Sequence, residues 1–86
     1  MTLKELKFAL VSGRTVVFER GHISTPATVT AVILQVERDS VVPYAEVKTM
    51  YGVTEKSTLS RLRFKDTTDI DRLVYFCDKA IEKIHF

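Results

Sequence analysis

The pattern of hydrophobic and polar residues changes its period twice along the chain. Apolar residues recur at helical spacing over about residues 3–12, alternate with polar residues from about 15 to 64, and return to helical spacing over about 69–84. A helix, then consecutive strands, then a helix is typical of an α+β protein. We therefore expect a small, strongly twisted antiparallel sheet or half-barrel of four to five strands, with an N-terminal helix and a C-terminal amphipathic helix.

Local signals mark both ends of the first helix. Thr2 and Glu5 have the spacing of a capping box, in which each side chain binds the backbone N–H of the other residue. Gly13 is suited to the left-handed conformation that ends many helices. The apolar residues between these signals form one stripe, made up of Leu3, Leu6, Ala9 and Leu10.

The alternating region predicts strands over about residues 15–20, 27–38, 41–49 and 54–64, the last with a kink near Ser60 and a short fifth piece after it. The residues between the first two strands, 22–26, are predicted to form a polar loop. A run as long as the second strand is expected to bend and to serve both sides of a small barrel.

Side chains of the second strand are expected to alternate between two faces along its whole length. One face would carry Val32, Leu34 and Val36. The opposite face would carry Val29, Ala31 and Ile33.

The last helix is predicted to have one apolar face and one face of mixed charge. Its apolar positions are Ile70, Leu73, Val74, Cys77, Ala80, Ile81 and Ile84. Tyr75 lies almost opposite these positions, among cations, and Tyr and Arg are enriched in interface hot spots. The residues expected to bind a protein partner are Arg72, Tyr75, Phe76, Lys79 and Lys83.

Two plainer interpretations apply to the exposed aromatic residues. A helix face of mixed charge is usually a solvated surface, and Tyr75 could make a cation–π contact within its own helix. Tyr44, Met50 and Tyr51 are expected to form a further exposed cluster near the hairpin tips, or else to cover the mouth of a barrel.

A basic stretch gives a second candidate surface. It carries four positive charges in ten residues and no acidic side chain: Lys56, Arg61, Arg63 and Lys65. In an extended backbone Arg61, Arg63 and Lys65 would project from one face, where each could neutralise a phosphate. The plainer interpretation is an edge strand that charge protects against aggregation.

Composition limits the choices further. The chain has 86 residues, which is one domain, and its 45% hydrophobic and 28% charged residues are ordinary for a globular protein. The net charge is +2 and the isoelectric point is near 8.8. A dedicated nucleic-acid-binding domain usually has an isoelectric point above 9, so this balance permits such binding without requiring it.

Residues for catalysis or metal binding do not cluster in the sequence. Cys77 is the single cysteine, His22 and His85 are far apart, and the three glycines are dispersed, so we expect no enzyme, no metal and no cofactor. A lone thiol fits a reducing compartment, and no apolar run has the length of a signal peptide or a membrane span. We therefore expect a cytoplasmic protein.

Two resemblances bear on the class of protein. The succession of strand sequences resembles that of small barrels of the Tudor and Src-homology type; it consists of Val16-Val17-Phe18, Ala31-Val32-Ile33, Ala45-Glu46-Val47-Lys48 and Ser57-Thr58-Leu59. The opening residues 1–6, with Ser12-Gly13-Arg14, resemble small uncharacterised proteins of bacterial phages and mobile elements. The first resemblance implies a binding module rather than an enzyme. The aromatic cage with which some Tudor domains bind methylated side chains is not identifiable in this sequence.

These observations together predict a small non-enzymatic protein-interaction module, of the kind that a phage or mobile element encodes. It would bind a host protein, or itself as a twofold dimer. The alternative is sequence-nonspecific nucleic-acid binding through the basic stretch. Neither a membrane nor a small-molecule substrate is expected.

Overall fold

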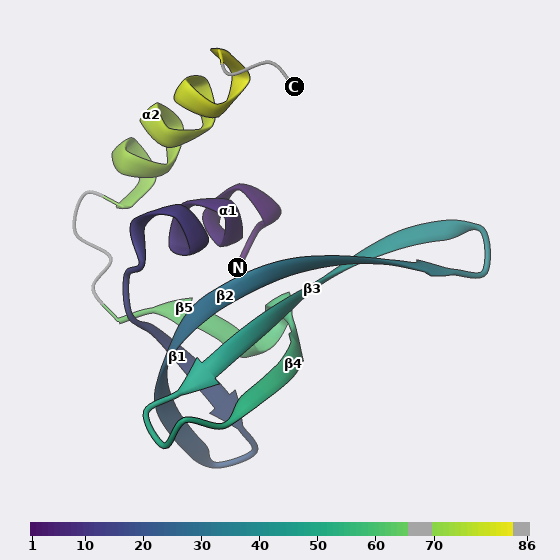
Figure 1. Cartoon of the computed structure of the whole chain (residues 1–86), viewed down its shortest axis with the longest axis vertical. Helices are drawn as coiled ribbons and strands as arrows, with labels where there is room; N and C mark the ends of the chain where they lie inside the picture. Colours follow the sequence, from purple (N-terminus) through teal and green to yellow (C-terminus); the bar gives the residue numbers. More distant parts are fainter. Residues whose placement is uncertain (66–69, 84–86) are drawn as a thin grey trace.

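The fold is α+β: one antiparallel five-stranded sheet, with a helix before it and a helix after it (Figure 1). This computed structural model describes residues 1–65 and 70–83, and within the second range the side chains of 70, 72–75, 77 and 79. The elements are α1 (Leu3–Ser12), β1 (Val16–Arg20), β2 (Ile23–Glu37), β3 (Ser40–Thr49), β4 (Thr54–Thr58), the 3₁₀ helix η1 (Leu59–Arg61), β5 (Leu62–Phe64) and α2 (Ile70–Lys83). The strand order is β4-β3-β2-β1-β5, so β4 and β5 are the edges, and within the described residues the sheet does not close.

The predicted capping signals of α1 are confirmed. Thr2 Oγ1 accepts a hydrogen bond from the Glu5 N–H at 3.2 Å, and Glu5 Oε1 accepts one from the Thr2 N–H at 2.9 Å. Gly13 has φ 67°, and its N–H donates to the Ala9 carbonyl at 3.2 Å. Both ends of the helix therefore have partners for backbone groups that would otherwise be unsatisfied.

The core lies between α1 and the sheet. Leu6 and Ala9 of the predicted stripe are fully buried. Phe8, which the stripe did not include, is buried as well, because its ring packs edge-on against Phe64 of β5, with centroids 5.9 Å apart. Such a pair adds about 1 kcal/mol to the gain from burial alone. In turn α2 packs on α1, so α1 lies between the sheet and α2 (Figure 1).

The prediction of a loop at residues 22–26 is wrong, because β2 already begins at Ile23. All five residues of β1 pair with Ile23–Ala27, and Pro26 lies opposite Val17 within the ladder. Pairing with a neighbouring strand thus outweighs the low strand propensity of this polar, proline-containing segment.

A β-bulge at Thr30 changes the faces of β2. Val29 pairs with Val47, but the next pair is Ala31 with Glu46, so Thr30 is an extra residue on β2. Its hydroxyl donates to Glu46 Oε1 at 2.8 Å. The bulge shifts the alternation by one residue, which places Val29 on the same face as Val32 and its i+2 neighbours. The prediction of opposite faces for Val29 and Val32 is therefore wrong.

The predicted strand over residues 54–64 is divided in two. β4 ends at Thr58 and pairs with β3, η1 covers Leu59–Arg61, and β5 pairs with β1 at the other edge of the sheet. The 3₁₀ turn lets the chain cross from one edge of the curled sheet to the other. An ion pair joins the same two regions, since Arg20 Nη1 at the end of β1 lies 3.1 Å from Glu55 Oε2 on β4.

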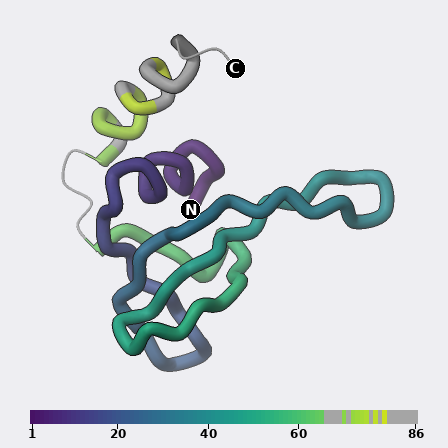
Figure 2. Tube along the Cα trace, viewed as in Figure 1, coloured from purple at the N-terminus to yellow at the C-terminus, as the bar shows by residue number. Residues whose placement is uncertain are grey.

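One part of the sheet projects from the rest of the molecule (Figure 2). β1 pairs only with residues 23–27 of β2, and β4 pairs only with residues 44–48 of β3. Beyond these segments, within the part of the chain that the structure describes, β2 and β3 pair only with each other, and they continue as a two-stranded hairpin to a turn at Arg38 and Asp39. We call residues 32–43 the arm, and the remainder of the sheet with α1 the body.

Candidate protein-binding surface

One face of the arm is a continuation of the face that packs in the core. In the body this face carries Val29, Ala45 and Val47, which are buried in the core that the curled sheet forms with α1. In the arm the same face carries Val32, Leu34, Val36, Val41 and Pro43.

Within the arm this face loses its cover with distance from the body. Val32 still packs against the core. Leu34, Val36 and Val41 are 63%, 74% and 59% exposed, and Figure 1 shows that the arm runs out past the end of α1. A contiguous group of exposed apolar side chains is typical of a binding surface rather than of free solvent contact. We define the apolar face of the arm as Val32, Leu34, Val36, Val41 and Pro43.

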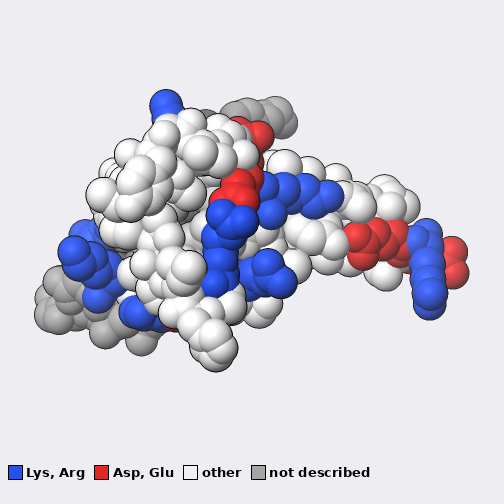
Figure 3. Space-filling model, turned by 90° about the horizontal axis from the view of Figure 1, so that it is seen from below, with Lys and Arg blue, Asp and Glu red and all other residues white. Residues whose placement is uncertain are grey.

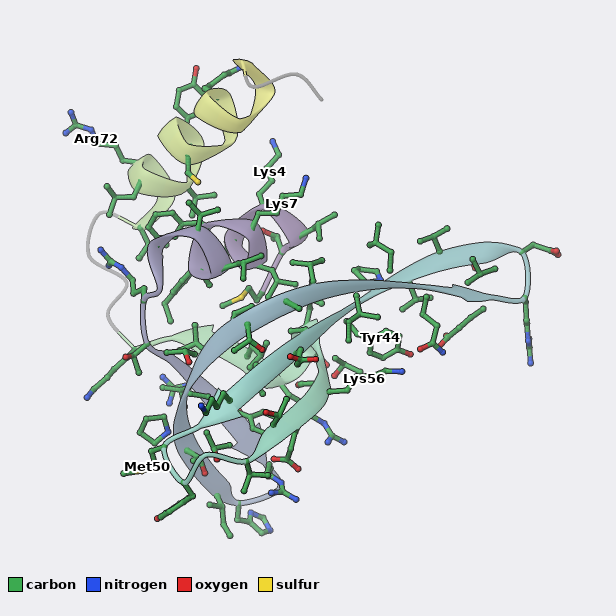
Figure 4. The ribbon with its side chains drawn as sticks, in the orientation of Figure 1. Lys4, Lys7, Tyr44, Met50, Lys56 and Arg72 are labelled. Carbon is green, nitrogen blue, oxygen red and sulfur yellow. The ribbon has the colours of Figure 1, made fainter. Side chains whose placement is uncertain are left out.

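The opposite face of the arm carries a polar network. Tyr44 Oη donates to Glu37 Oε1 at 2.5 Å, and Gln35 Nε2 donates to the same oxygen at 3.1 Å. From β4, Lys56 Nζ donates to Gln35 Oε1 and lies 4.4 Å from the centroid of the Tyr44 ring. Figure 4 shows Tyr44 and Lys56 side by side at the base of the arm. The network ties the arm to the body through β4 and leaves the apolar face free.

The network also affects the ionisation of Tyr44. Its hydrogen bond to Glu37 raises the pKa of the Tyr44 phenol above its ordinary value, with smaller contributions from desolvation and from the charge of Glu37. Removing the phenolic proton would break the bond and place two negative charges together.

The predicted surface on α2 is described in part. Arg72, Tyr75 and Lys79 are exposed, Tyr75 by 59%, and Lys79 Nζ lies 5.8 Å from the Tyr75 ring centroid. Figure 4 shows Arg72 pointing away from α1 and from the sheet. The side chains of Phe76 and Lys83, which were expected to enlarge this surface, lie outside the described residues.

The apolar face predicted for α2 is described in part, because the side chains of Ala80, Ile81 and Ile84 lie outside the described residues. Ile70 and Val74 are buried and Cys77 is half-buried, but Leu73 is exposed. The element that α2 packs on is a single helix, α1, and a helix covers a narrower strip than a sheet.

The structure does not bring the predicted basic residues onto one strand face. Arg61 belongs to η1, Arg63 lies on β5, and Lys65 follows the end of β5. Arg63 Nε is paired with Glu19 Oε1 at 2.7 Å, and Lys56 is part of the network under the arm. On the face that Figure 3 shows, Lys and Arg side chains form several separate groups, with Asp and Glu next to some of them.

A second group of exposed apolar side chains lies at the end of the body, around the turns that join the strands. It comprises Ile23, Met50, Tyr51 and Val53. The Met50 N–H donates to the Pro26 carbonyl at 3.3 Å and holds the β3–β4 turn against β2. The prediction that grouped Tyr44 with Met50 and Tyr51 is wrong, since Figure 4 shows Tyr44 far from Met50, at the base of the arm.

Three further findings concern metal sites, membrane-spanning helices and similar proteins. Among the described residues, no group of three or more His, Cys, Asp and Glu side chains could hold a metal ion. None of the described helices is both long enough and apolar enough to traverse a lipid bilayer. No protein-family model matches the chain, and neither a curated protein nor a solved structure is significantly similar to it.

The arm is the surface that sequence reasoning missed. The alternation of β2 and β3 was visible, but alternation indicates only which residues share a face and not what covers that face. One signal was available. The two runs that form the hairpin are expected at 12 and 9 residues, whereas the first strand is expected at only six, too short to pair along their full length.

Proposed function

We propose that the protein is a small non-enzymatic protein-interaction module that binds its partner through the apolar face of the arm. The observation that carries this proposal is the exposure of Leu34, Val36 and Val41 on a face that is otherwise a hydrophobic core. In this proposal the curled sheet is a strongly twisted half-barrel that serves as a rigid platform. The ion pair between Arg20 and Glu55, which joins β1 to β4 across the curl, supports that description.

The size of the apolar face indicates weak to moderate affinity. Fully burying an aliphatic side chain contributes about 2 kcal/mol, so three that are roughly two-thirds exposed contribute about 4 kcal/mol. Association itself costs at least about this much in lost freedom of motion. Further contacts are therefore needed, and backbone hydrogen bonds along the outer edge of β2, which β1 does not cover beyond Ala27, are one source.

Selection from a displayed library of random peptides tests the proposal, with Leu34→Glu and Ile23→Glu as matched variants. Both residues are exposed apolar side chains on β2, so neither substitution is expected to unfold the protein, but Ile23 lies away from the arm. We expect peptides selected by the wild type to lose binding to Leu34→Glu and to keep it with Ile23→Glu. Peptides that bind both variants equally would contradict the proposal, and so would a chain that neither selects a peptide nor binds a second copy of itself through Leu34.

The α2 surface is tested in the same experiment. If it is the binding site, Tyr75→Ala abolishes binding of the selected peptides and Leu34→Glu does not. The proposal for the arm predicts the reverse order of effects.

Nucleic-acid binding remains the alternative that the sequence suggested. The pairing of Arg63 with Glu19 reduces the positive charge available along β5, so we expect at most weak binding that added salt abolishes. Fluorescence anisotropy with labelled DNA and RNA, at about 50 and 200 mM salt, measures it directly. Micromolar binding that Arg61→Ala and Lys65→Ala both weaken would favour this alternative over the arm.

A further inference from the structure

We infer that the arm binds a second copy of this chain, with the two apolar faces stacked on each other and the arms antiparallel about a twofold axis. This inference rests on the proposed function, because it names the partner of the same surface. A twofold interface uses one patch on both subunits, so the patch has to be complementary to itself.

The side chains of the apolar face meet this requirement. Leu34 and Pro43 lie at the middle of the apolar face, Val36 and Val41 lie toward the tip, and Val32 lies toward the base. When two such faces stack antiparallel, the tip of each arm covers the base of the other and Leu34 meets Leu34 near the axis. The exposed Val36 and Val41 of one copy then fall near the half-buried Val32 of its partner.

The layers of the fold leave room for this arrangement. Sheets that stack face to face lie about 10 Å apart, close to the spacing of a helix packed on a sheet. In the body α1 covers this face of β2, and beyond α1 the face is uncovered (Figure 1). In the dimer, the partner's arm would cover the apolar face of this arm in the same way that α1 covers the sheet of the body.

Charge at the two ends of the stack is complementary. The apolar face itself has no charged side chain, and the charges of the hairpin are at its tip, where Glu37, Arg38 and Asp39 sum to −1. An antiparallel partner brings this tip to the end of α1 nearest the arm. Lys4 and Lys7 lie on the half of α1 nearer the arm, with side chains that Figure 4 shows directed away from the sheet, and together with Glu5 they sum to +1.

The area predicts a weak dimer. Six residues per strand span about 20 Å, and two strands are about 10 Å wide, so each face offers a footprint of roughly 200 Å². With the contact at α1, the total buried area stays below the roughly 1,200 Å² at which stable complexes begin. Pairing of two β2 edges would leave the apolar faces in water, and for this reason we favour stacking of the faces.

Sedimentation velocity over a protein range from about 5 to 500 µM tests whether the second copy binds. We expect a monomer–dimer equilibrium with a dissociation constant in the range of about 10–200 µM. Leu34→Glu is expected to weaken it at least tenfold, because the twofold axis would bring the two new charges together, whereas Ile23→Glu leaves it unchanged. Equal weakening by both variants, or a monomer at every concentration, overturns the inference.

Chemical cross-linking tests the antiparallel register. In a Cys77→Ser background, Leu34→Cys is treated with a bismaleimide of about 8 Å reach, which suits facing sheets better than a disulfide does. We expect a covalent dimer from Leu34→Cys and none from Tyr51→Cys, whose side chain is exposed at the far turn. A parallel stack would cross-link Val36→Cys to itself as strongly as Leu34→Cys, and that result would also overturn the inference.

A charge exchange tests the contact between the tip and α1. Asp39→Lys and Lys7→Glu are each expected to weaken the dimer about three- to tenfold, and the double variant is expected to recover most of the loss. Additive losses would contradict this placement of the tip. If the chain is monomeric but still selects peptides through Leu34, only the identity of the partner is wrong, and the proposed function stands.

Discussion

The body and the arm share two strands and one continuous apolar face, but they differ in what covers that face. In the body, Val29 and Val47 belong to the core that the curled five-stranded sheet forms with α1, and they are nearly inaccessible to water. In the arm, Leu34 and Val36 continue the same face with the same kind of side chain and are largely exposed. The pattern of the sequence is the same in both regions, so burial is determined by the neighbours that the topology supplies.

The difference in cover implies a difference in local stability. An isolated two-stranded hairpin is marginally stable in water, whereas three or more strands with a packed face are stable. The arm therefore depends on the network around Glu37 and Tyr44 and on its continuity with the body. We expect the arm to open locally at a lower free energy than the global unfolding of the body.

The largest expected effect separates the two regions directly. Leu6 of α1 is fully buried over the sheet, and Leu6→Ala should lower the free energy of unfolding by about 2–5 kcal/mol because it leaves a cavity. Leu34→Ala on the arm should change it by less than about 0.5 kcal/mol. Urea denaturation followed by circular dichroism measures both. Similar losses for the two variants would mean that the arm is packed in solution.

The next largest change in unfolding free energy is expected at the Thr30 bulge, which lies where the body meets the arm. Deleting Thr30 should restore a regular ladder without exchanging the faces of the arm, because Val29 and Val32 then alternate in phase. The lost bend should cost about 1–2 kcal/mol in unfolding free energy, since the curl of the body depends on it.

Thr30→Ala is the matched control for that deletion. It keeps the extra residue and loses only the hydrogen bond to Glu46. This loss should lower the free energy of unfolding by about 0.5–1 kcal/mol. The same denaturation measurement ranks the two variants. A deletion less harmful than Thr30→Ala would show that the bulge does not shape the body.

A smaller effect, of opposite sign, is expected at the tip of the arm. Arg38 has φ 54°, a left-handed conformation that costs a residue with a Cβ about 1 kcal/mol or more, and that glycine adopts freely. Arg38→Gly should stabilise the hairpin by about 0.5 kcal/mol after the entropy lost on folding is subtracted. Hydrogen exchange should slow in the arm and stay unchanged in the body. Slower exchange in the body alone would contradict the separation of the two regions.

The smallest effect is a dependence on pH that is confined to the arm. Because folding raises the pKa of Tyr44, the folded arm holds this proton more tightly than the unfolded chain. The stability that the protonated Tyr44 adds to the arm through its hydrogen bond to Glu37 is therefore complete below pH about 10. It is lost as the pH rises through the pKa of Tyr44 in the folded state. Absorbance at alkaline pH should show one late-titrating tyrosine, which Tyr44→Phe removes and Glu37→Gln shifts back toward its ordinary pKa. If Glu37→Gln leaves the titration unchanged, the hydrogen bond is not the cause.

Local signals in the sequence predicted local structure well. The capping box of Thr2 and Glu5 and the left-handed Gly13 are confirmed, because each depends on atoms a few residues apart. Ala45 and Val47 are both buried, as the regular alternation of β3 indicates, because β3 pairs with β2 and β4 without a bulge of its own.

What the sequence did not predict depends on contacts between distant segments. Thr30 is a threonine in a run of strand-forming residues, and no glycine marks it as a bulge. Phe8 is buried by Phe64, which is 56 positions away and reaches it only because β5 returns to pair with β1. The sequence predicts a kink near Ser60, but it does not indicate that the residues after it pair with β1 at the opposite edge of the sheet, which separates the basic residues.

The two-residue turn at the tip of the arm has a consequence for how such a protein changes over time. Adding one residue to each strand next to Arg38 and Asp39 preserves all the pairing nearer the body and alters only how far the hairpin reaches. The length of the projection is thus independent of the scaffold that folds, and it can drift toward a new target geometry while the scaffold stays the same.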